Sequence, residues 1–191
     1  MEVEELNKKQ RRYLKIKRVL SIIHVIIFSP FYLSLFIIVL LINMFVTKFH
    51  PFFVQERYGR NRKIFKVYKF RTIDEKTNHS NSFARFLRFT SLDEIPQFFN
   101  ILKGDMDLIG PRPLSIKEED MDILRNVHPY NVYLVRPGLS GYAQINYVNE
   151  SSLDKKASYD KYYIEHFSFK LDCKIFFLTI FKILPITIHK K

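Results

Sequence analysis

A long apolar run from Val19 to Thr47 dominates the hydrophobic pattern of the chain, and it contains no acidic or basic side chain except His24. A straight helix of this length would measure about 43 Å, whereas the hydrocarbon core of a bilayer is about 30 Å thick. The run is too long for the apolar region of a signal peptide, and no small-residue cleavage site follows it. The pattern therefore indicates a helical segment that enters a membrane.

Ser29 and Pro30 interrupt this run and divide it into two arms, each of which is short for a membrane span. The proline removes one backbone hydrogen bond and disfavours a helical conformation at Ser29, so we expect a sharp bend there. Basic residues flank both ends of the run, and positive flanks favour the cytoplasmic side. A basic N-terminus and a re-entrant membrane helix broken at Ser-Pro, together residues 1–48, satisfy both flanks. An ordinary kinked transmembrane helix is the alternative.

The pattern after residue 48 is broken into shorter segments and predicts a small globular, membrane-associated domain over residues 49–191. Partial alternation over Ile64–Thr72 predicts a strand, and the order Arg136-Pro137-Gly138 predicts a type II turn. The fold class is therefore α+β, mainly helical, with a short sheet. Other segments predict a strand over 139–145 and helices over 83–89, 115–130, 154–163 and 169–183.

The last of these helices, Phe169 to Ile183, is amphipathic. Lys170, Lys174 and Lys182 fall within about a third of its circumference, and phenylalanine, leucine and isoleucine occupy most of the rest. This pattern is typical of a helix in a membrane interface, with its lysines among the lipid headgroups. A buried core helix is the alternative, and the lysines count against it.

Composition narrows the range of partners. The 191 residues provide one domain's worth of chain, with 47% hydrophobic residues, 19 phenylalanines and no tryptophan. The formal net charge of +12 implies an acidic partner, which is nucleic acid, anionic lipid or a phosphorylated substrate. The single cysteine, Cys173, excludes an internal disulfide, and no cysteine–histidine cluster has zinc spacing. A cytoplasmic location for the soluble part fits this composition.

Two adjacent carboxylates, Asp93 and Glu94, stand immediately before an apolar helical pattern that ends at Lys103-Gly104. A capping box from Ser91 to Glu94 would place Pro96 too deep in the helix, where its ring meets a backbone carbonyl. We therefore expect the helix to begin at or just after Asp93, with its free N–H groups beside both acids. The pair is either a functional site or a plain helix start.

Several basic residues could reach an anion near this acid pair. Lys69 and Arg71 stand two residues apart at the end of a predicted strand and so share one face, as a phosphate clamp or as solvent-facing charges on an edge strand. Arg112 lies between two prolines that fix the backbone around it, which limits the freedom it loses on binding an anion. A rigid connector with an exposed arginine is the alternative. The predicted helix over 83–89 carries Arg88 towards the acids.

Taken together, these features resemble the monotopic phosphoglycosyl transferases, the bacterial sugar transferases that act on polyprenyl phosphate. The resemblance covers nearly the whole chain in order. It rests on Lys17-Arg18, Ser29-Pro30, Gln55-Glu56-Arg57-x-Gly59, Lys69-Phe70-Arg71-Thr72, Leu87-Arg88-x-Thr90-Ser91-Leu92-Asp93-Glu94-x-Pro96-Gln97, Gly104-Asp105-Met106, Gly110-Pro111-Arg112-Pro113, Arg136-Pro137-Gly138-x-x-Gly141-x-Ala143-Gln144 and Asp160-x-x-Tyr163 to Ser168-x-x-x-Asp172.

The resemblance implies transfer of a sugar 1-phosphate from a UDP-sugar to polyprenyl (undecaprenyl) phosphate, with release of UMP. Asp93 would be the nucleophile and would bind Mg²⁺, while Glu94 would assist the lipid phosphate step or help to hold the ion. The expected location is the cytoplasmic face of the bacterial inner membrane, as the first membrane step of surface glycan assembly. A homodimer is left open. The implied substrate-binding residues are Arg88, Lys69, Arg71, Arg112, Arg136, Gln97 and Asp160.

The chain departs from the family pattern at Ser21, where an aspartate is usual, at His50-Pro51, where Gly-Pro is usual, and near Tyr147-Val148-Asn149, where Gly-Arg-Asn is usual. The departure at Ser21 bears on the contact between the membrane helix and the globular part. A catalytically inactive scaffold of the same fold is therefore one alternative. A membrane-tethered nucleic-acid-binding module is another, although we expect no nucleic acid partner. Neither the sugar nor the glycan pathway follows from the sequence.

Overall fold

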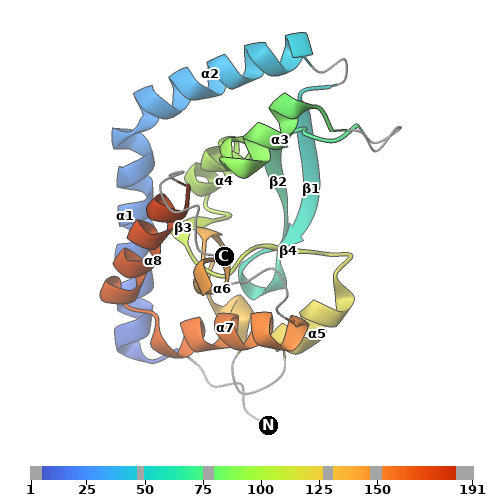
Figure 1. Cartoon of the computed structure of the whole chain (residues 1–191). Helices are drawn as coiled ribbons and strands as arrows, with labels where there is room; N and C mark the ends of the chain where they lie inside the picture. The colour runs from blue at the N-terminus through green and yellow to red at the C-terminus, as the bar shows by residue number, and fades with distance from the viewer. Residues whose placement is uncertain (1–5, 47–49, 75–79, 127–130, 147–151, 184–191) are drawn as a thin grey trace.

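The computed structural model describes residues 6–46, 50–74, 80–126, 131–146 and 152–183, which form a mainly helical structure with two small sheets. Helix α1 (Lys8–Ile27) begins at a capping box between Asn7 and Gln10. Helix α2 (Ser29–Val46) follows α1 after the single residue Phe28 and leaves at a steep angle to it, as Figure 1 shows. The hydroxyl of Ser29 donates to the carbonyl oxygen of Ile26 at 2.7 Å, near the end of α1.

Helix α2 is long and apolar enough to cross a membrane, with a mean hydropathy of 2.2 and little buried surface. These properties agree with a membrane segment by length and composition. The re-entrant course, and a break caused by Ser29-Pro30, stay predictions, as does the alternative of a kinked transmembrane helix.

The larger sheet has the order β2-β1-β4 and is antiparallel. Its strands are β1 (Phe52–Tyr58), β2 (Ile64–Phe70) and β4 (Leu114–Ser115), and the short helix η1 (Arg60–Arg62) lies in the turn between β1 and β2. The strand predicted over Ile64–Thr72 is confirmed in position. In the smaller sheet, β3 (Asp107–Ile109) pairs in parallel with β5 (Gly138–Ser140).

The remaining helices lie mostly to one side of β1 and β2, which stand at the right edge of the view in Figure 1. The predictions of helices near 83–89, 154–163 and 169–183 are confirmed, whereas the helix predicted over 115–130 begins only at Glu119, because Leu114 and Ser115 pair with β1. Residues 127–130 lie outside the described part of the chain. The helices are α3 (Ser82–Phe89), η2 (Leu92–Glu94), α4 (Gln97–Lys103), α5 (Glu119–Asn126), η3 (Val132–Leu134), α6 (Tyr142–Asn146), α7 (Leu153–His166) and α8 (Phe169–Ile183).

Two local predictions around Gly138 are wrong. The strand expected over 139–145 ends at Ser140, where its partner β3 ends, and the chain continues as helix α6. A short apolar run cannot distinguish a strand from a helical turn. Gly138 is a strand residue without a positive φ, so the type II turn is absent. Gly138 is needed for close approach instead, since a Cβ atom there would lie 2.1 Å from the backbone nitrogen of Gly110.

Helix α1 packs against the globular part of the chain. Leu14 and Val25 on α1 belong to clusters of buried apolar side chains, the first with Tyr163 and Ile175 and the second with residues of β2 and α4. Ser21 is 3% exposed, and its hydroxyl oxygen accepts a hydrogen bond from the backbone N–H of Leu108 at 3.2 Å. Serine therefore makes a contact between α1 and β3. The division into residues 1–48 and 49–191 stays a prediction.

A buried polar network joins α1 to the two C-terminal helices. Lys17 is 4% exposed; it donates to the hydroxyl of Tyr163 and lies 3.2 Å from a carboxylate oxygen of Asp172. Tyr13 and Tyr163 also donate to the two carboxylate oxygens of Asp172, at 2.7 Å and 2.6 Å. Because each charge has both an opposite charge and hydrogen bonds, the pair is tolerated in the interior and fixes α8 against α1.

Candidate active site

Asp93 and Glu94 lie on the 3₁₀ turn η2, between α3 and α4. The apolar helix begins at Gln97, with Pro96 as its N-cap, so the prediction that it begins at or just after Asp93 is wrong. The reason is the proline, which is accommodated at the boundary of α4 rather than inside it. Ser91 has a left-handed conformation (φ 57°) and no side-chain cap, which excludes the capping box. Asp93 and Glu94 are therefore not explained as residues placed at the free N–H groups of the first turn of α4.

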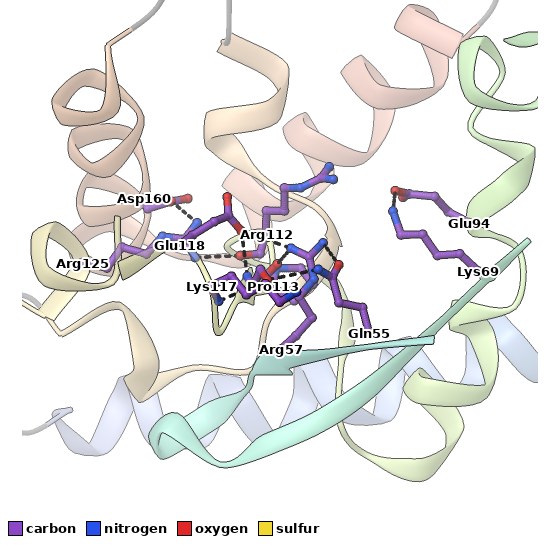
Figure 2. A network of polar contacts seen from close by, with 11 residues as sticks. Gln55, Arg57, Lys69, Glu94, Arg112, Pro113, Lys117, Glu118, Arg125 and Asp160 are labelled. Carbon is purple, nitrogen blue, oxygen red and sulfur yellow. Dashed lines mark hydrogen bonds and ion pairs between the residues drawn. The ribbon is translucent and has the colours of Figure 1, made fainter. Parts of the chain in front are cut away.

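Glu94 forms an ion pair with Lys69 on β2, with 2.5 Å between the ammonium nitrogen and a carboxylate oxygen (Figure 2). Both side chains are mostly buried, at 17% and 18% exposure. Because the pair is mostly shielded from water, its attraction is stronger than that of an exposed pair. The structure thus brings one of the predicted phosphate-binding residues into direct contact with the acid pair.

Asp93 has a perturbed pKa. Burial, and secondly the negative charge of Glu94, raise the pKa of Asp93 to about 6, while Lys69 and Arg112 act in the opposite direction. Burial disfavours the charged form of a carboxyl group, and a neighbouring carboxylate adds to this effect. At neutral pH Asp93 is mostly ionised but poorly solvated, which suits a carboxylate nucleophile.

Arg112 joins this acid pair to a larger polar site. It follows β3 in the segment Gly110-Pro111-Arg112-Pro113 and lines a narrow notch together with Lys69, Glu94 and Gln97. Gln97 is 2% exposed, and within the described residues its amide nitrogen has no hydrogen-bond partner. Three of the predicted substrate-binding residues, Lys69, Arg112 and Gln97, are therefore assembled beside Glu94.

Beyond the notch lies a second cavity of about 320 Å³, which we call the arginine pocket. Figure 2 shows Arg112 between the Lys69–Glu94 pair and the Arg125–Asp160 pair, and Arg112 lines both the notch and this pocket. Its ionisable lining residues are Arg57, Arg112, Glu118, Arg125, Lys156 and Asp160.

Asp160 is the predicted substrate-binding residue found in this pocket. It is 1% exposed and lies 2.5 Å from the guanidinium of Arg125, which is 4% exposed. Burial raises the pKa of Asp160, and the Arg125 charge opposes the shift. In the part of the chain that the structure describes, the second carboxylate oxygen of Asp160 and the Nε of Arg125 have no hydrogen-bond partner. Unsatisfied buried polar atoms are rare, and both of these atoms are enclosed by protein rather than open to the space of the pocket.

Sequence reasoning missed two arginines of this pocket. Arg57 donates to the carbonyl oxygen of Pro113 at 2.9 Å and to the side-chain oxygen of Gln55 at 2.5 Å. Arg125 donates to the carbonyl oxygen of Arg112 at 2.8 Å. Arg57 belongs to the motif Gln55-Glu56-Arg57 and could have been found there. Arg125 lies in an amphipathic helix, and the residues around it form no motif that would have indicated a role in a binding site.

An apolar cavity of about 630 Å³ opens on the other side of the acid pair. It lies among α1, α2, α6 and α8, and Glu94 and Ile95 form part of its wall. Glu94 therefore lines both the apolar cavity and the polar notch, and Gln144 lines these two and the arginine pocket. The aromatic and aliphatic lining includes Phe31, Tyr32, Leu35, Phe98, Ile145, Phe176 and Ile180.

Three predicted phosphate contacts are not brought to these cavities. Arg88 donates to the carbonyl oxygen of Thr72 at 3.5 Å and to the hydroxyl of Ser80 at 2.9 Å. Arg71 donates to the carbonyl oxygen of Phe52, and Arg136 to that of Gly104. None of the three lines the notch, the arginine pocket or the apolar cavity. Their roles in substrate binding stay predictions.

Among the described residues, no group of three or more histidine, cysteine, aspartate or glutamate side chains could hold a metal ion. The donor set of Asp93 and Glu94 nevertheless fits Mg²⁺, which is commonly held by one or two carboxylates together with substrate phosphates. Since Glu94 is already paired with Lys69, Asp93 is the carboxylate better suited to the ion.

The profile of a family described as "Bacterial sugar transferase" matches residues 12–185. The chain is 40% identical over 143 residues to a protein of Bacillus subtilis named "Uncharacterized sugar transferase EpsL", covering 70% of this chain and 69% of that protein. It is 35% identical over 192 residues to the "UDP-N-acetylgalactosamine-undecaprenyl-phosphate N-acetylgalactosaminephosphotransferase" of Aeromonas hydrophila, covering 90% and 44%.

A further relative is the "UDP-glucose:undecaprenyl-phosphate glucose-1-phosphate transferase" of Klebsiella pneumoniae, 39% identical over 148 residues, covering 68% of this chain and 32% of that protein. The chain thus corresponds to less than half the length of these two named transferases. Their names specify different sugars, so similarity alone does not select one.

Proposed function

Because the chain belongs to the bacterial sugar transferase family, we propose that it transfers a sugar 1-phosphate from a UDP-sugar to undecaprenyl phosphate and releases UMP. One observation carries this proposal: Glu94, next to Asp93, lies on the wall shared by the polar notch and the apolar cavity. A reaction between a water-soluble donor and a lipid acceptor needs such a boundary.

The donor fits the polar side of the boundary. Arg112 stands between the acid pair and the arginine pocket, where its guanidinium can bind the diphosphate in a bidentate manner. The nucleoside or the sugar would then occupy the arginine pocket. There, Arg57, Arg112 and Lys156 line the space that the donor would occupy.

The acceptor fits the apolar side. The cavity is lined mostly by aromatic and aliphatic side chains from helices that include α2, which is apolar enough for a membrane. A polyprenyl chain placed there would bring its phosphate to Glu94 and Asp93. Lys69, paired with Glu94, would partly neutralise the approaching phosphate.

The chemistry divides one displacement into two. A carboxylate oxygen of Asp93 attacks the phosphorus that carries the sugar, and the bond from this phosphorus to the UMP oxygen breaks. An oxygen of the lipid phosphate then attacks the same phosphorus, which releases the Asp93 carboxylate and forms the new diphosphate. Glu94 orients the lipid phosphate or accepts its proton. Asp93 would hold Mg²⁺, whose positive charge would stabilise the negative charge that develops on the leaving phosphate.

The site would work at the cytoplasmic face of the bacterial inner membrane, in the first membrane step of surface glycan assembly. The re-entrant course predicts that tags on both termini are cytoplasmic. A periplasmic N-terminus would favour the kinked transmembrane helix instead.

The test is transfer of radiolabel from a panel of UDP-sugars to undecaprenyl phosphate with Mg²⁺, using the purified chain and Asp93→Asn. We expect lipid-linked label with the wild type and its loss in the variant. Without the lipid acceptor, a sugar-phosphoryl adduct should be trapped on Asp93; an adduct on Glu94 would reverse the assigned roles. No label with any sugar would favour an inactive scaffold, and salt-sensitive DNA or RNA binding unaffected by Asp93→Asn would favour the nucleic-acid-binding alternative.

A further inference from the structure

A separate basic pocket of about 290 Å³, which we call the loop pocket, lies between the β1–β2 turn and the C-terminal end of α4. Four cationic side chains line it: Arg60, Lys63, Lys103 and Arg136. The loop pocket shares no lining residue with the notch, the arginine pocket or the apolar cavity. Of the four cations, only Arg136 is among the substrate-binding residues that the resemblance implies, so the transfer reaction does not account for Arg60, Lys63 and Lys103.

The turn that forms one wall of the loop pocket has an unusual conformation. Asn61 and Arg62 both have positive φ, 55° and 58°, which is unfavourable for a bulky residue such as arginine. Arg62 is held by Asp122 at 2.5 Å and lies over the ring of Tyr58, 5.2 Å from its centroid. These contacts offset the strain. They direct Arg62 towards α5, while Arg60 and Lys63 remain exposed at the loop pocket.

The opposite wall comes from other parts of the chain. The Nε of Arg136 donates to the carbonyl oxygen of Gly104 at 2.8 Å, which orients the guanidinium. Lys103 lies 3.4 Å from the hydroxyl of Tyr68. Cations are favoured at the C-terminal end of a helix, and this accounts for Lys103 and Arg136.

The helix end does not account for Arg60 and Lys63, which belong to the β1–β2 turn. Among the described lining residues of the loop pocket, the only carboxylate is Asp105, which accepts a hydrogen bond from Asn100 at 3.2 Å. Four cations thus converge on a concave space with one partly satisfied acid. Such an arrangement attracts an anion of more than one charge.

We propose that the loop pocket binds a phosphate-bearing ligand at a site distinct from the transfer site. Guanidinium groups bind phosphate oxygens in pairs, and lysines add point charges. The phosphate can belong to an anionic lipid headgroup or to a soluble phosphate compound, since both present the same oxygens. The size of the pocket accommodates a phosphate with part of the group that it is attached to.

The experiment uses the purified full chain in nonionic detergent and three probes: a soluble short-chain phosphatidylglycerol, UMP and inorganic phosphate. Binding is measured by titration calorimetry for the wild type, for Arg60→Ala/Lys63→Ala, and for the matched control Lys155→Ala/Lys161→Ala on α7, which removes the same charge elsewhere. We expect the first variant to weaken binding of at least one probe by about tenfold or more, because two charge-assisted contacts are lost. The control should change it less than about twofold.

Loss confined to phosphatidylglycerol would identify a lipid headgroup, and loss for UMP or phosphate a soluble ligand; both outcomes support the proposal. Equal affinities of the wild type and Arg60→Ala/Lys63→Ala for all three probes, or no saturable binding, would overturn it. Because Arg60 and Lys63 are exposed, the variant should keep the unfolding temperature of the wild type. Should it not, Lys63→Gln alone replaces it, with the same criterion. UMP bound at the transfer site is unaffected by these changes, so the two sites are distinguished.

Discussion

The candidate nucleophile Asp93 is expected to destabilise the folded protein, although transfer requires it. Asp93→Asn removes the negative charge and keeps the size of the side chain. We expect this substitution to abolish transfer and to raise the free energy of unfolding at neutral pH. A residue needed only for the fold would show the opposite effect on stability.

The magnitude follows from the pKa. Burial and the Glu94 charge raise the pKa of Asp93 from 3.8 to about 6, and one pKa unit corresponds to about 1.4 kcal/mol. The ionised carboxylate therefore lowers the free energy of unfolding by up to about 3 kcal/mol above pH 6. Since the native state binds this proton more tightly than the unfolded chain, the cost decreases as the pH falls from 6 to 4 and disappears below it. The variant lacks this dependence.

The assay is unfolding of the wild type and Asp93→Asn in mild detergent at pH 7.5 and at pH 4. We expect the variant to be more stable by about 2–3 kcal/mol at pH 7.5, which corresponds to a rise of about 4 °C or more in Tm for a chain of this size. At pH 4 the difference should be small. Glu56→Gln is the matched control, because Glu56 is an exposed carboxylate on β1 and its loss should change stability by less than about 0.5 kcal/mol.

Two results would refute the reasoning about stability, and a third would refute the catalytic role. If Asp93→Asn is less stable than the wild type at pH 7.5, the ionised carboxylate does not destabilise the folded state as its burial and the Glu94 charge imply. If the difference between the two proteins is the same at both pH values, its cause is not the ionisation of Asp93. Transfer that continues at the wild-type rate in the variant would contradict its role as nucleophile.

Further predictions concern the residues around Asp93 and the arginine pocket. Lys69→Met should lower kcat/KM by about tenfold or more, since Glu94 loses its partner; the exposed Lys66→Met on the same strand should change it little. Arg125→Met should destabilise the fold by about 3–5 kcal/mol, measured by denaturant unfolding, because it leaves Asp160 buried and unpaired. Arg125→Met/Asp160→Leu should recover most of this loss but keep a raised KM for the UDP-sugar, whereas a normal KM would exclude the pair from donor binding. Gly138→Ala should prevent folding, seen as loss of the cooperative unfolding transition, because a Cβ atom there would lie 2.1 Å from Gly110.

Features that depend on local pattern are predictable from the amino-acid sequence. The apolar segment with Ser29-Pro30, the strand at 64–70 and the helices near 83–89, 154–163 and 169–183 follow from periodicity, because each of these segments repeats its apolar positions over several residues. The adjacent acids Asp93 and Glu94, and the ordered motifs that lead to the family, are also readable without coordinates.

Features that depend on contacts between distant segments are not predictable from local pattern. Tyr142–Asn146 forms a helix because the parallel pair of β3 and β5 ends at Ser140, a limit set by a distant segment. Lys69 reaches Glu94 and Arg112 joins two cavities, whereas Arg88, Arg71 and Arg136, chosen by the same sequence criteria, donate to backbone oxygens elsewhere. The local sequence around a charged side chain does not show which buried carboxylate or carbonyl group it will contact. That contact depends on how separate elements pack.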